Sequence, residues 1–380
     1  MEEHEVAIVG AGPAGSVCAK ELAKAGVDVV LFDHSHPREK PCGGAIPARI
    51  FQDFKIPKEI IEREIHYIIL GDDNGNYARI PQKKGGIVVL RKKFDHYWLK
   101  EAVKAGAKFY DEKVNRVEKG KEWTLKTSKR TVKAKTLIGA DGANSIVRKT
   151  VLGPIPKEHL SHGIFYHIKH SKRYMKEKFE DAIELHFIGK PHIEFGYFWI
   201  FPKLDVVNVG IASRLGTSHL KEILDKFLRE HERAKRINLN DKIETFAHLI
   251  PSAASPKFFD LPTTGQNWIL IGDAAGHVNP ITGEGIFYAM TDGKLSAKAY
   301  LEGDLSLFEN YWRKNYGSDM YIGSRLKKFV YNQSIITRLI KAASKDRVIN
   351  SIMGDMIACR QPYNKLLVNL ILNLPRLIFV

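Results

Sequence analysis

The stretch that most constrains this chain is residues 6–33. It contains an apolar strand, a glycine-rich turn, an Ala-rich helical pattern and a second apolar strand that ends at Asp33. In such a unit Gly10 permits the tight turn, Gly12 lets the backbone approach a pyrophosphate, and Gly15 lets the helix pack on the strand. The helix N-terminus offers free N–H groups to the phosphates, and an acid about 20 residues further on accepts from a ribose hydroxyl. The sequence therefore predicts a dinucleotide site formed by Gly10, Gly12, Ala14, Gly15 and Asp33.

Two later segments also read as an apolar strand that delivers an aspartate and glycines to its end. Residues 137–148 contain Asp141 and Gly142, and residues 268–286 contain Asp273 followed by a glycine-rich loop that enters a helix. In an open α/β sheet the carboxyl ends of the strands converge on the ligand crevice. Three strand ends that lie far apart in the sequence are thus expected to meet one extended ligand.

FAD is the ligand that needs three such segments. Its ribityl chain requires a carboxylate, for which we predict Asp273. Its flavin requires a glycine-lined helix start, where N–H groups stabilise the negative charge of the reduced ring. The residues predicted at this helix start are Gly283, Gly285 and Ile286. No second glycine fingerprint follows another strand, so we expect electrons to come from a transiently bound donor.

The remaining pattern predicts an α/β protein in which an FAD-binding, doubly wound (Rossmann-like) domain carries an inserted antiparallel-sheet substrate domain and C-terminal helices. Four strand-like stretches and a helix over 218–236 define the insertion. Before it we expect a helical pattern over 51–68, a polar hairpin over 69–86, an amphipathic helix after Arg91 and a small meander over 113–135. The expected boundaries are 1–153 and 255–300 for the FAD domain, 154–254 for the substrate domain and 301–380 for the helices.

Composition limits the class of protein and the cell compartment that we expect. The 380 residues are 44% hydrophobic and 27% charged, which is typical of globular proteins, and no run of 18 apolar residues predicts a membrane span. We expect no signal or transit peptide, because the first strand begins within about six residues of Met1 and the first residues are acidic. Three widely spaced cysteines argue against a disulfide framework. We expect a cytoplasmic protein, with peripheral contact at the inner membrane face left open.

The net charge of +16 is the least ordinary property of the composition. A basic surface suits an anionic membrane or a phosphorylated lipid, and it also suits a solvated surface without a partner. The basic residues are spread along the chain rather than gathered in an arm, so no nucleic-acid partner is expected. The apolar stripes after residue 363 could cap a lipid tunnel, lie on a membrane or pack on the protein's own core.

The three nucleotide segments, with Arg91 between them, resemble the flavoprotein hydroxylase and reductase superfamily typified by p-hydroxybenzoate hydroxylase. Residues 40–47 (KPCGGAIP) resemble the cysteine-glycine-glycine loop of the geranylgeranyl reductases within it. Residues 196–202 (GYFWIFP) resemble that family's PxxYxWxFP signature, although Glu194 stands where the leading proline belongs. The resemblance covers roughly residues 1–300. It implies that the FAD site also includes Cys42, Gly43, Gly44, Arg91 and Val114.

The resemblance further implies reduction of carbon–carbon double bonds in polyprenyl chains by reduced FAD. An isolated alkene needs a proton donor, electron-rich faces and no water, because protonation places positive charge on a tertiary carbon. We predict that Cys42 relays the proton and that Tyr197, Trp199 and Phe201 line the prenyl channel from one face of a strand. The alternatives are that Cys42 is a small buried hydrophobe and that the aromatic residues are ordinary core.

Several functional alternatives remain at this point. The primary expectation is a reductase of archaeal-type digeranylgeranylglycerophospholipids, and a geranylgeranyl diphosphate or chlorophyll-type reductase is the nearest rival. A flavin monooxygenase of aromatic substrates shares the fold, and a non-catalytic basic flavoprotein is a third class. The electron donor could be NAD(P)H, ferredoxin or a deazaflavin. No metal motif is present, and His277 is expected to be a hydrogen-bonding residue of its loop.

Overall fold

The computed structural model describes residues 2–40, 42–189, 193–239 and 243–378. The chain forms two compact units, and each is assembled from three stretches of sequence. The first unit comprises Met1–Lys40, Arg91–His159 and Ile250–Tyr321. The second comprises Pro41–Leu90, Leu160–Leu249 and Ile322–Val380.

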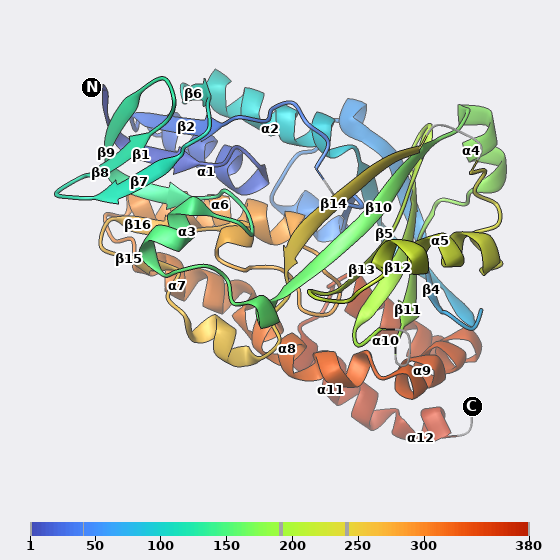
Figure 1. The fold of residues 1–380 in the computed structure, drawn as a ribbon. Coiled ribbons are helices and arrows are strands. Elements are labelled where there is room, and N and C mark those ends of the chain that lie inside the picture. Colours follow the sequence, from blue (N-terminus) through green and yellow to red (C-terminus); the bar gives the residue numbers. More distant parts are fainter. Residues whose placement is uncertain (1, 41, 190–192, 240–242, 379–380) are drawn as a thin grey trace. The chain divides into compact units, whose positions relative to one another are not determined.

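The first unit is built on a parallel sheet in the strand order β16-β9-β1-β2-β6 (Figure 1). β1 is central and fully buried from Val6 to Val9, which explains its continuous apolar sequence. The antiparallel β15 extends one edge, and the hairpin β7–β8 pairs with β9. The strands are β1 (Glu2–Val9), β2 (Val29–Asp33), β6 (Lys108–Asp111), β7 (Arg116–Lys119), β8 (Trp123–Lys126), β9 (Thr131–Gly139), β15 (Thr264–Gly265) and β16 (Trp268–Leu270).

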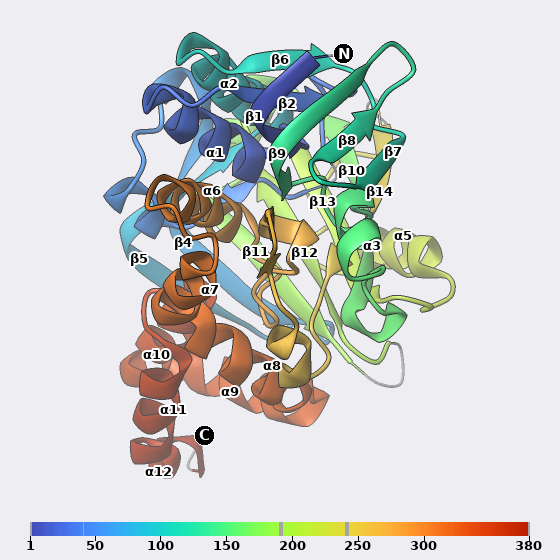
Figure 2. The same ribbon diagram turned by 90° about the vertical axis from the view of Figure 1, so that its left-hand side faces the viewer.

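Helices α1 and α6 pack on each other in this unit (Figure 2). A glycine at position 293 allows the close approach, because a Cβ atom there would lie 2.5 Å from the backbone oxygen of Ala14. The helices of this unit are α1 (Pro13–Lys24), α2 (Arg91–Lys104), α3 (Ile146–Val151), α6 (Ile286–Leu301) and α7 (Leu307–Trp312). A π-helical segment (Arg313–Gly317) leads into α8 (Ser318–Val330). Short 3₁₀ turns occur at Lys157–His159, Pro256–Asp260 and Gly272–Ala274.

The second unit contains an eight-stranded sheet in the order β14-β10-β13-β12-β11-β4-β5-β3. Strand β11 pairs in parallel with β4, whereas the pairs β10–β13, β13–β12, β12–β11, β4–β5 and β5–β3 are antiparallel. Helix α5 (Leu220–Glu230) covers one face of this sheet, where Phe227 stacks on Phe198 of β12 with ring centroids 4.0 Å apart. The strands are β3 (Ala45–Ile46), β4 (Ile61–Asp72), β5 (Tyr77–Val89), β10 (Leu160–Lys169), β11 (Ala182–Ile188), β12 (Gly196–Pro202), β13 (Val206–Arg214) and β14 (Ile243–Pro251).

The helical pattern predicted over residues 51–68 is wrong. Only two 3₁₀ turns (Ala48–Gln52 and Lys58–Ile60) precede the long strand β4, which begins at Ile61. β4 forms a hairpin with β5 and pairs in parallel with β11, more than a hundred residues later. These non-local hydrogen bonds decide the conformation over the local apolar spacing. The sheet unit is consequently larger than the insertion predicted at 154–254.

Two other predicted elements have different bounds in the structure. The third strand of the predicted meander and the apolar strand at 137–148 are one continuous strand, β9, because it pairs along its length with β1. The helix expected over 218–236 is α5, which ends at Glu230. A short additional helix, α4 (Lys172–Lys178), is present in the second unit.

The C-terminal segment is helical, as predicted. Helices α9 (Gln333–Lys345) and α10 (Arg347–Ile357) pack against β5, and α11 (Tyr363–Leu372) and α12 (Leu374–Ile378) follow them (Figure 2). Leu366 is buried, whereas Val368, Ile371 and Leu372 are 56%, 60% and 71% exposed. Among the residues that the structure describes, no helix is both long and apolar enough to cross a bilayer.

Candidate active site

The turn between β1 and α1 shows why its glycines stand where they do. Gly10 has a φ of +101°, and a Cβ atom on Gly15 would lie 1.9 Å from the backbone oxygen of Gly10. Both positions therefore need glycine for the fold itself. Gly12 differs, because a Cβ atom there would meet no protein atom within 4 Å. Gly12 is also the N-cap of α1 and has no side-chain cap, and Ala14 is buried in the first turn. Open space beside uncapped helix N–H groups fits a pyrophosphate.

Asp33 lies at the end of β2 beside this turn. Its Oδ2 accepts a hydrogen bond from the backbone N–H of Ala11 at 2.9 Å, and its Oδ1 accepts from the hydroxyl of Ser35 at 2.6 Å. Burial by itself raises the pKa of Asp33, but the contact with Nε2 of His36 at 3.5 Å and the hydrogen bonds from Ser35 and Ala11 outweigh it and hold the pKa below its usual range. The group is therefore a carboxylate that can accept from a ribose hydroxyl.

Asp141 and Gly142 follow β9, the other neighbour of β1. The Oδ2 atom of Asp141 accepts from the N–H of Ile146 at 2.6 Å, whereas its Oδ1 atom is shielded from solvent and has no hydrogen-bond partner. Burial raises the pKa of this carboxyl. Gly142 has a φ of +81°, which suits the turn after the strand. A shielded carboxyl oxygen without a partner at a strand end is what a polar ligand would satisfy.

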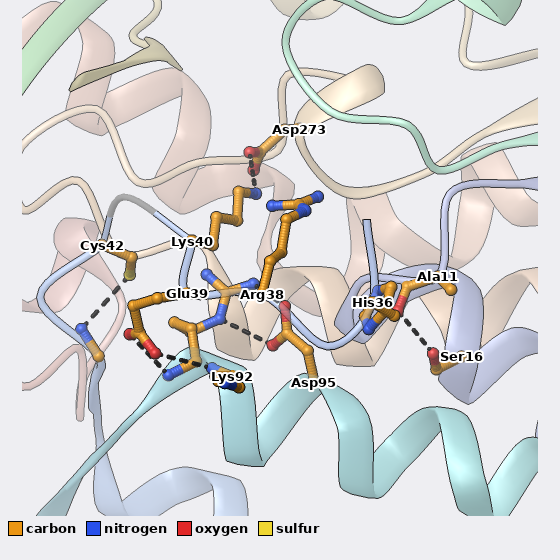
Figure 3. A network of polar contacts seen from close by, with 12 residues as sticks. Ala11, Ser16, His36, Arg38, Glu39, Lys40, Cys42, Lys92, Asp95 and Asp273 are labelled. Atoms are coloured by element: carbon orange, nitrogen blue, oxygen red, sulfur yellow. Dashed lines mark hydrogen bonds and ion pairs between the residues drawn. The ribbon is translucent and has the colours of Figure 1, made fainter. Parts of the chain in front are cut away.

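The third segment brings Asp273 next to the start of α6. Lys40 donates a hydrogen bond to Asp273 Oδ2 at 3.2 Å, as Figure 3 shows. A Cβ atom on Gly285 would lie 3.5 Å from the other carboxylate oxygen, so aspartate and helix start are close neighbours. Gly283 has a φ of +70°, and Gly285 caps the helix at Ile286 without a side-chain cap. The structure thus brings these four predicted residues together.

A buried hydrogen-bond network supports this segment. Asp292 Oδ2 accepts from the N–H of Gly272 at 2.8 Å and lies 2.7 Å from Nδ1 of His277, and the hydroxyl of Tyr316 donates to Oδ1. His277 is a hydrogen-bonding residue, as predicted. The sequence reasoning missed Asp292 and Tyr316, although an aspartate inside the apolar pattern of a helix is itself a sign that a buried partner exists.

Replacing Asp273 with asparagine should weaken FAD binding. The variant removes the carboxylate that we expect to accept from the ribityl hydroxyls, and a hydrogen bond to a charged group contributes about 1.5–3 kcal/mol, so the dissociation constant should rise about 10-fold or more. Titration of the apoprotein with FAD, followed by flavin fluorescence, measures this. Asp304→Asn removes the same charge from an exposed loop of the same unit and serves as control. Equal affinity in all three proteins would rule the role out.

Two predicted cofactor residues have roles within the protein. The guanidinium of Arg91 is buried and binds both carboxylate oxygens of Asp95, at 2.8 and 2.7 Å. The backbone N–H groups of Arg91 and Lys92 donate to the Glu39 carboxylate, which fastens the loop after β2 to the start of α2 (Figure 3). Val114 is buried in a core cluster beneath the first sheet. These contacts explain both residues by packing, and their contact with FAD stays a prediction.

The Cys42 loop lies on the sheet of the second unit. Cys42 is half-buried, and the backbone N–H of Gly44 donates to its Sγ atom at 3.4 Å (Figure 3). A Cβ atom on Gly43 would lie 2.3 Å from the ring of Phe201, and one on Gly44 would lie 2.2 Å from the backbone oxygen of Val89. The two glycines are therefore required by the close approach of the loop to the sheet.

The aromatic residues of β12 share one face of that sheet. Ring centroids are 6.0 Å apart for Tyr197 and Trp199 and 6.5 Å apart for Trp199 and Phe201. Trp199 is buried and donates to Asn208 Oδ1 at 2.5 Å, and Asn208 Nδ2 donates to the backbone oxygen of Cys42 at 3.2 Å. Asn208 thus joins the cysteine loop to the aromatic strand, two segments that the sequence analysis assigned to one reaction without predicting a contact between them.

No group of three or more His, Cys, Asp or Glu side chains is arranged to hold a metal ion in the described parts of the chain.

Comparisons with known proteins identify relatives of this chain. Residues 4–240 match the family model described as pyridine nucleotide-disulphide oxidoreductase. A geranylgeranyl diphosphate reductase of Rhodobacter capsulatus is 32% identical over 83% of this chain and 81% of its own. A digeranylgeranylglycerophospholipid reductase of Methanococcus vannielii is 31% identical over 83% of each chain. A geranylgeranyl bacteriochlorophyll reductase-like protein of Thermoplasma acidophilum shares the fold, with a TM-score of 0.78 at 22% identity over 97% of this chain and 99% of that one.

The glycine turn, the three strand ends and these relatives lead to one conclusion. FAD is the cofactor of this chain, and its reaction is an oxidation–reduction. The chain belongs to the geranylgeranyl reductase family of FAD-dependent oxidoreductases.

Proposed function

We propose that this chain saturates the double bonds of geranylgeranyl groups attached to a glycerophospholipid. Reduction of carbon–carbon double bonds is the reaction of the family. The observation that carries the proposal is the contact between the Cys42 loop and the aromatic face of β12. A thiol and a wall of aromatic rings in one unit provide both an acid and electron-rich surfaces.

The residues of the first unit hold the cofactor in this proposal. The turn at Gly12 and the start of α1 bind the pyrophosphate, Asp33 and Asp273 accept from sugar hydroxyls, and Gly285 opens the helix start for the flavin. Reduced FAD supplies a hydride when it is bound.

The residues of the second unit act on the alkene. The thiol of Cys42 gives a proton to one alkene carbon, and the other carbon becomes electron-deficient and would take the hydride that reduced FAD supplies when bound. Aromatic faces such as those of Tyr197 and Trp199 stabilise a nearby cation by about 0.5–2 kcal/mol each. Burial of Trp199 and Phe201 keeps water from this face. The thiolate is then reprotonated from solvent.

Two properties favour a lipid-linked substrate. The exposed apolar residues Val368, Ile371 and Leu372 lie beside Lys365 on α11, which suits contact with an anionic lipid surface. The net charge of +16 also favours contact with an anionic lipid surface. The Methanococcus vannielii relative is named for a substrate of this type.

Free geranylgeranyl diphosphate is the second candidate substrate, since the Rhodobacter capsulatus relative is named for it. The two are separated by anaerobic turnover with dithionite as reductant, which removes the need to know the natural electron donor. Digeranylgeranylglycerophospholipid in anionic vesicles and geranylgeranyl diphosphate in solution are supplied in parallel, and mass spectrometry counts the saturated bonds. We expect kcat/KM to be about tenfold higher for the lipid. The reverse preference would favour the diphosphate. An oxygen requirement with hydroxylated product would indicate a monooxygenase instead.

A further inference from the structure

A lysine lies inside the second unit directly under the Cys42 loop. Lys203 follows β12 and is 0% exposed. An ammonium group removed from water is costly unless it is paired or hydrogen-bonded, so its partners carry information. Its Nζ atom donates to the backbone oxygen of Gly43 at 2.8 Å and to that of Val89 at 2.7 Å. The ammonium thus joins the loop to the last residue of β5.

The peptide group that Lys203 contacts also contacts the thiol. The oxygen of Gly43 and the N–H of Gly44 belong to the same peptide unit, and this N–H donates to Cys42 Sγ at 3.4 Å. In a trans peptide the C=O and N–H bonds point in opposite directions. The ammonium group of Lys203, which donates to the Gly43 oxygen, polarises the Gly43–Gly44 peptide group. The N–H of Gly44 becomes a stronger donor as a result, because hydrogen bonds in a chain reinforce one another. Lys203 therefore acts on the sulfur through one peptide group.

A second contact holds the same loop from the side. Asn208 Nδ2 donates to the backbone oxygen of Cys42 and lies 2.7 Å from Nε2 of His167. Burial, together with the charge of Lys203, lowers the pKa of His167 to about 3, so the ring is neutral near pH 7 and Nε2 can accept from the amide. The amide of Asn208 is oriented by His167 and by the indole N–H of Trp199. The loop thus has little freedom around the thiol.

We propose that Lys203 is a positioning residue that aims and polarises the Gly43–Gly44 peptide toward Cys42, and so stabilises the negative charge that develops on sulfur when the thiol gives up its proton. The catalytic part of this statement rests on the proposed function of Cys42. The effect on the sulfur itself does not require it, since it follows from contacts within the second unit.

The first test measures the thiol without substrate. In Lys203→Met, which keeps most of the length of the side chain but not its ammonium group, alkylation of Cys42 by iodoacetamide at neutral pH should be about threefold slower than in wild type, because the thiolate is the nucleophile. Peptide mass spectrometry identifies the modified cysteine. A merely loosened loop would expose the sulfur and leave the rate equal or faster, and either result overturns the proposal.

Two further variants serve as an alternative replacement and as a control for loss of stability. Lys203→Gln keeps a neutral N–H donor for the two carbonyl oxygens and is the replacement to use if the methionine variant does not fold. Its alkylation should also be slower, by about twofold, and a wild-type rate would contradict the role of the charge. Val207→Ala removes volume from the core on the opposite face of the sheet, under α5. It should lower stability and leave the alkylation rate unchanged.

The second test measures turnover in a double-mutant cycle. Lys203→Met should lower kcat about tenfold with KM within about twofold, and should have almost no effect in a Cys42→Ala background. Equal losses in both backgrounds would show that Lys203 does not act through Cys42. If the wild-type protein reduces no prenyl substrate, the proposed function fails, whereas the alkylation rates still decide the role of Lys203.

Discussion

Replacing Cys42 with alanine should lower turnover on a prenyl substrate by about 100-fold, because a positioned general acid contributes roughly 10²–10⁴-fold. The thiol has a hydrogen bond from the Gly44 N–H, which can support the thiolate that remains after proton donation. FAD affinity should change much less than turnover, since the glycine turn and the aspartates predicted to hold FAD belong to the first unit, and Cys42, which the resemblance also adds to the FAD site, would lose only its thiol.

Single-turnover reduction of substrate by the dithionite-reduced protein measures this effect apart from reloading of the cofactor. Cys42→Ser is expected to remain impaired, because a hydroxyl is a much weaker acid than a thiol. Cys359→Ala, a buried cysteine of the same unit, is the matched control and should retain turnover within about twofold. Full activity of the Cys42→Ala protein, with FAD bound normally, would remove the thiol from the mechanism.

Replacing Gly12 with alanine should produce a protein that folds normally and binds FAD poorly. The added Cβ atom would meet no protein atom within 4 Å, and Gly12 has a φ of −69° that alanine readily adopts. In the complex, however, the methyl group would stand where the pyrophosphate approaches the uncapped start of α1. Loss of the charge-assisted hydrogen bonds there, at about 1.5–3 kcal/mol each, corresponds to an increase in dissociation constant of about 10- to 100-fold.

The flavin absorbance of the purified protein and a titration of the apoprotein measure this loss. Thermal unfolding of the two apoproteins should give the same midpoint, which separates cofactor binding from folding. Gly15→Ala provides the contrast, since its Cβ atom would lie 1.9 Å from the backbone oxygen of Gly10 and should destabilise the apoprotein as well. A Gly12→Ala protein that takes up FAD with wild-type affinity would place the pyrophosphate elsewhere.

The first sheet could be read from the sequence because its signals are local. The signals lie within residues 6–33: a buried parallel strand, the positive φ of Gly10, a helix start and Asp33. Neighbouring residues dictate each of these conformations. The sequence also placed Asp273 and the start of α6 at one ligand, because strand ends in such a sheet share an edge.

Prediction from local sequence patterns failed where a strand pairs with strands far away in the sequence. The apolar spacing over residues 51–68 suits a helix, yet β4 forms because its hydrogen-bond partners are supplied by β5 and β11. Nothing near residue 61 encodes the arrival of β11. The helical prediction was therefore reasonable locally and wrong for the chain.

The surroundings of Cys42 show most clearly which features follow from the sequence and which only from the tertiary structure. The sequence by itself determined a nucleotide-binding α/β unit, a glycine pair after Cys42 and an aromatic strand with Trp199, since composition and short-range spacing suffice for these. Only the tertiary structure decided that Lys203 is buried beneath Gly43 and that Asn208 bridges Trp199 and Cys42. A lysine in a sequence indicates surface, and its burial depends on carbonyl oxygens from strands and loops more than a hundred residues away.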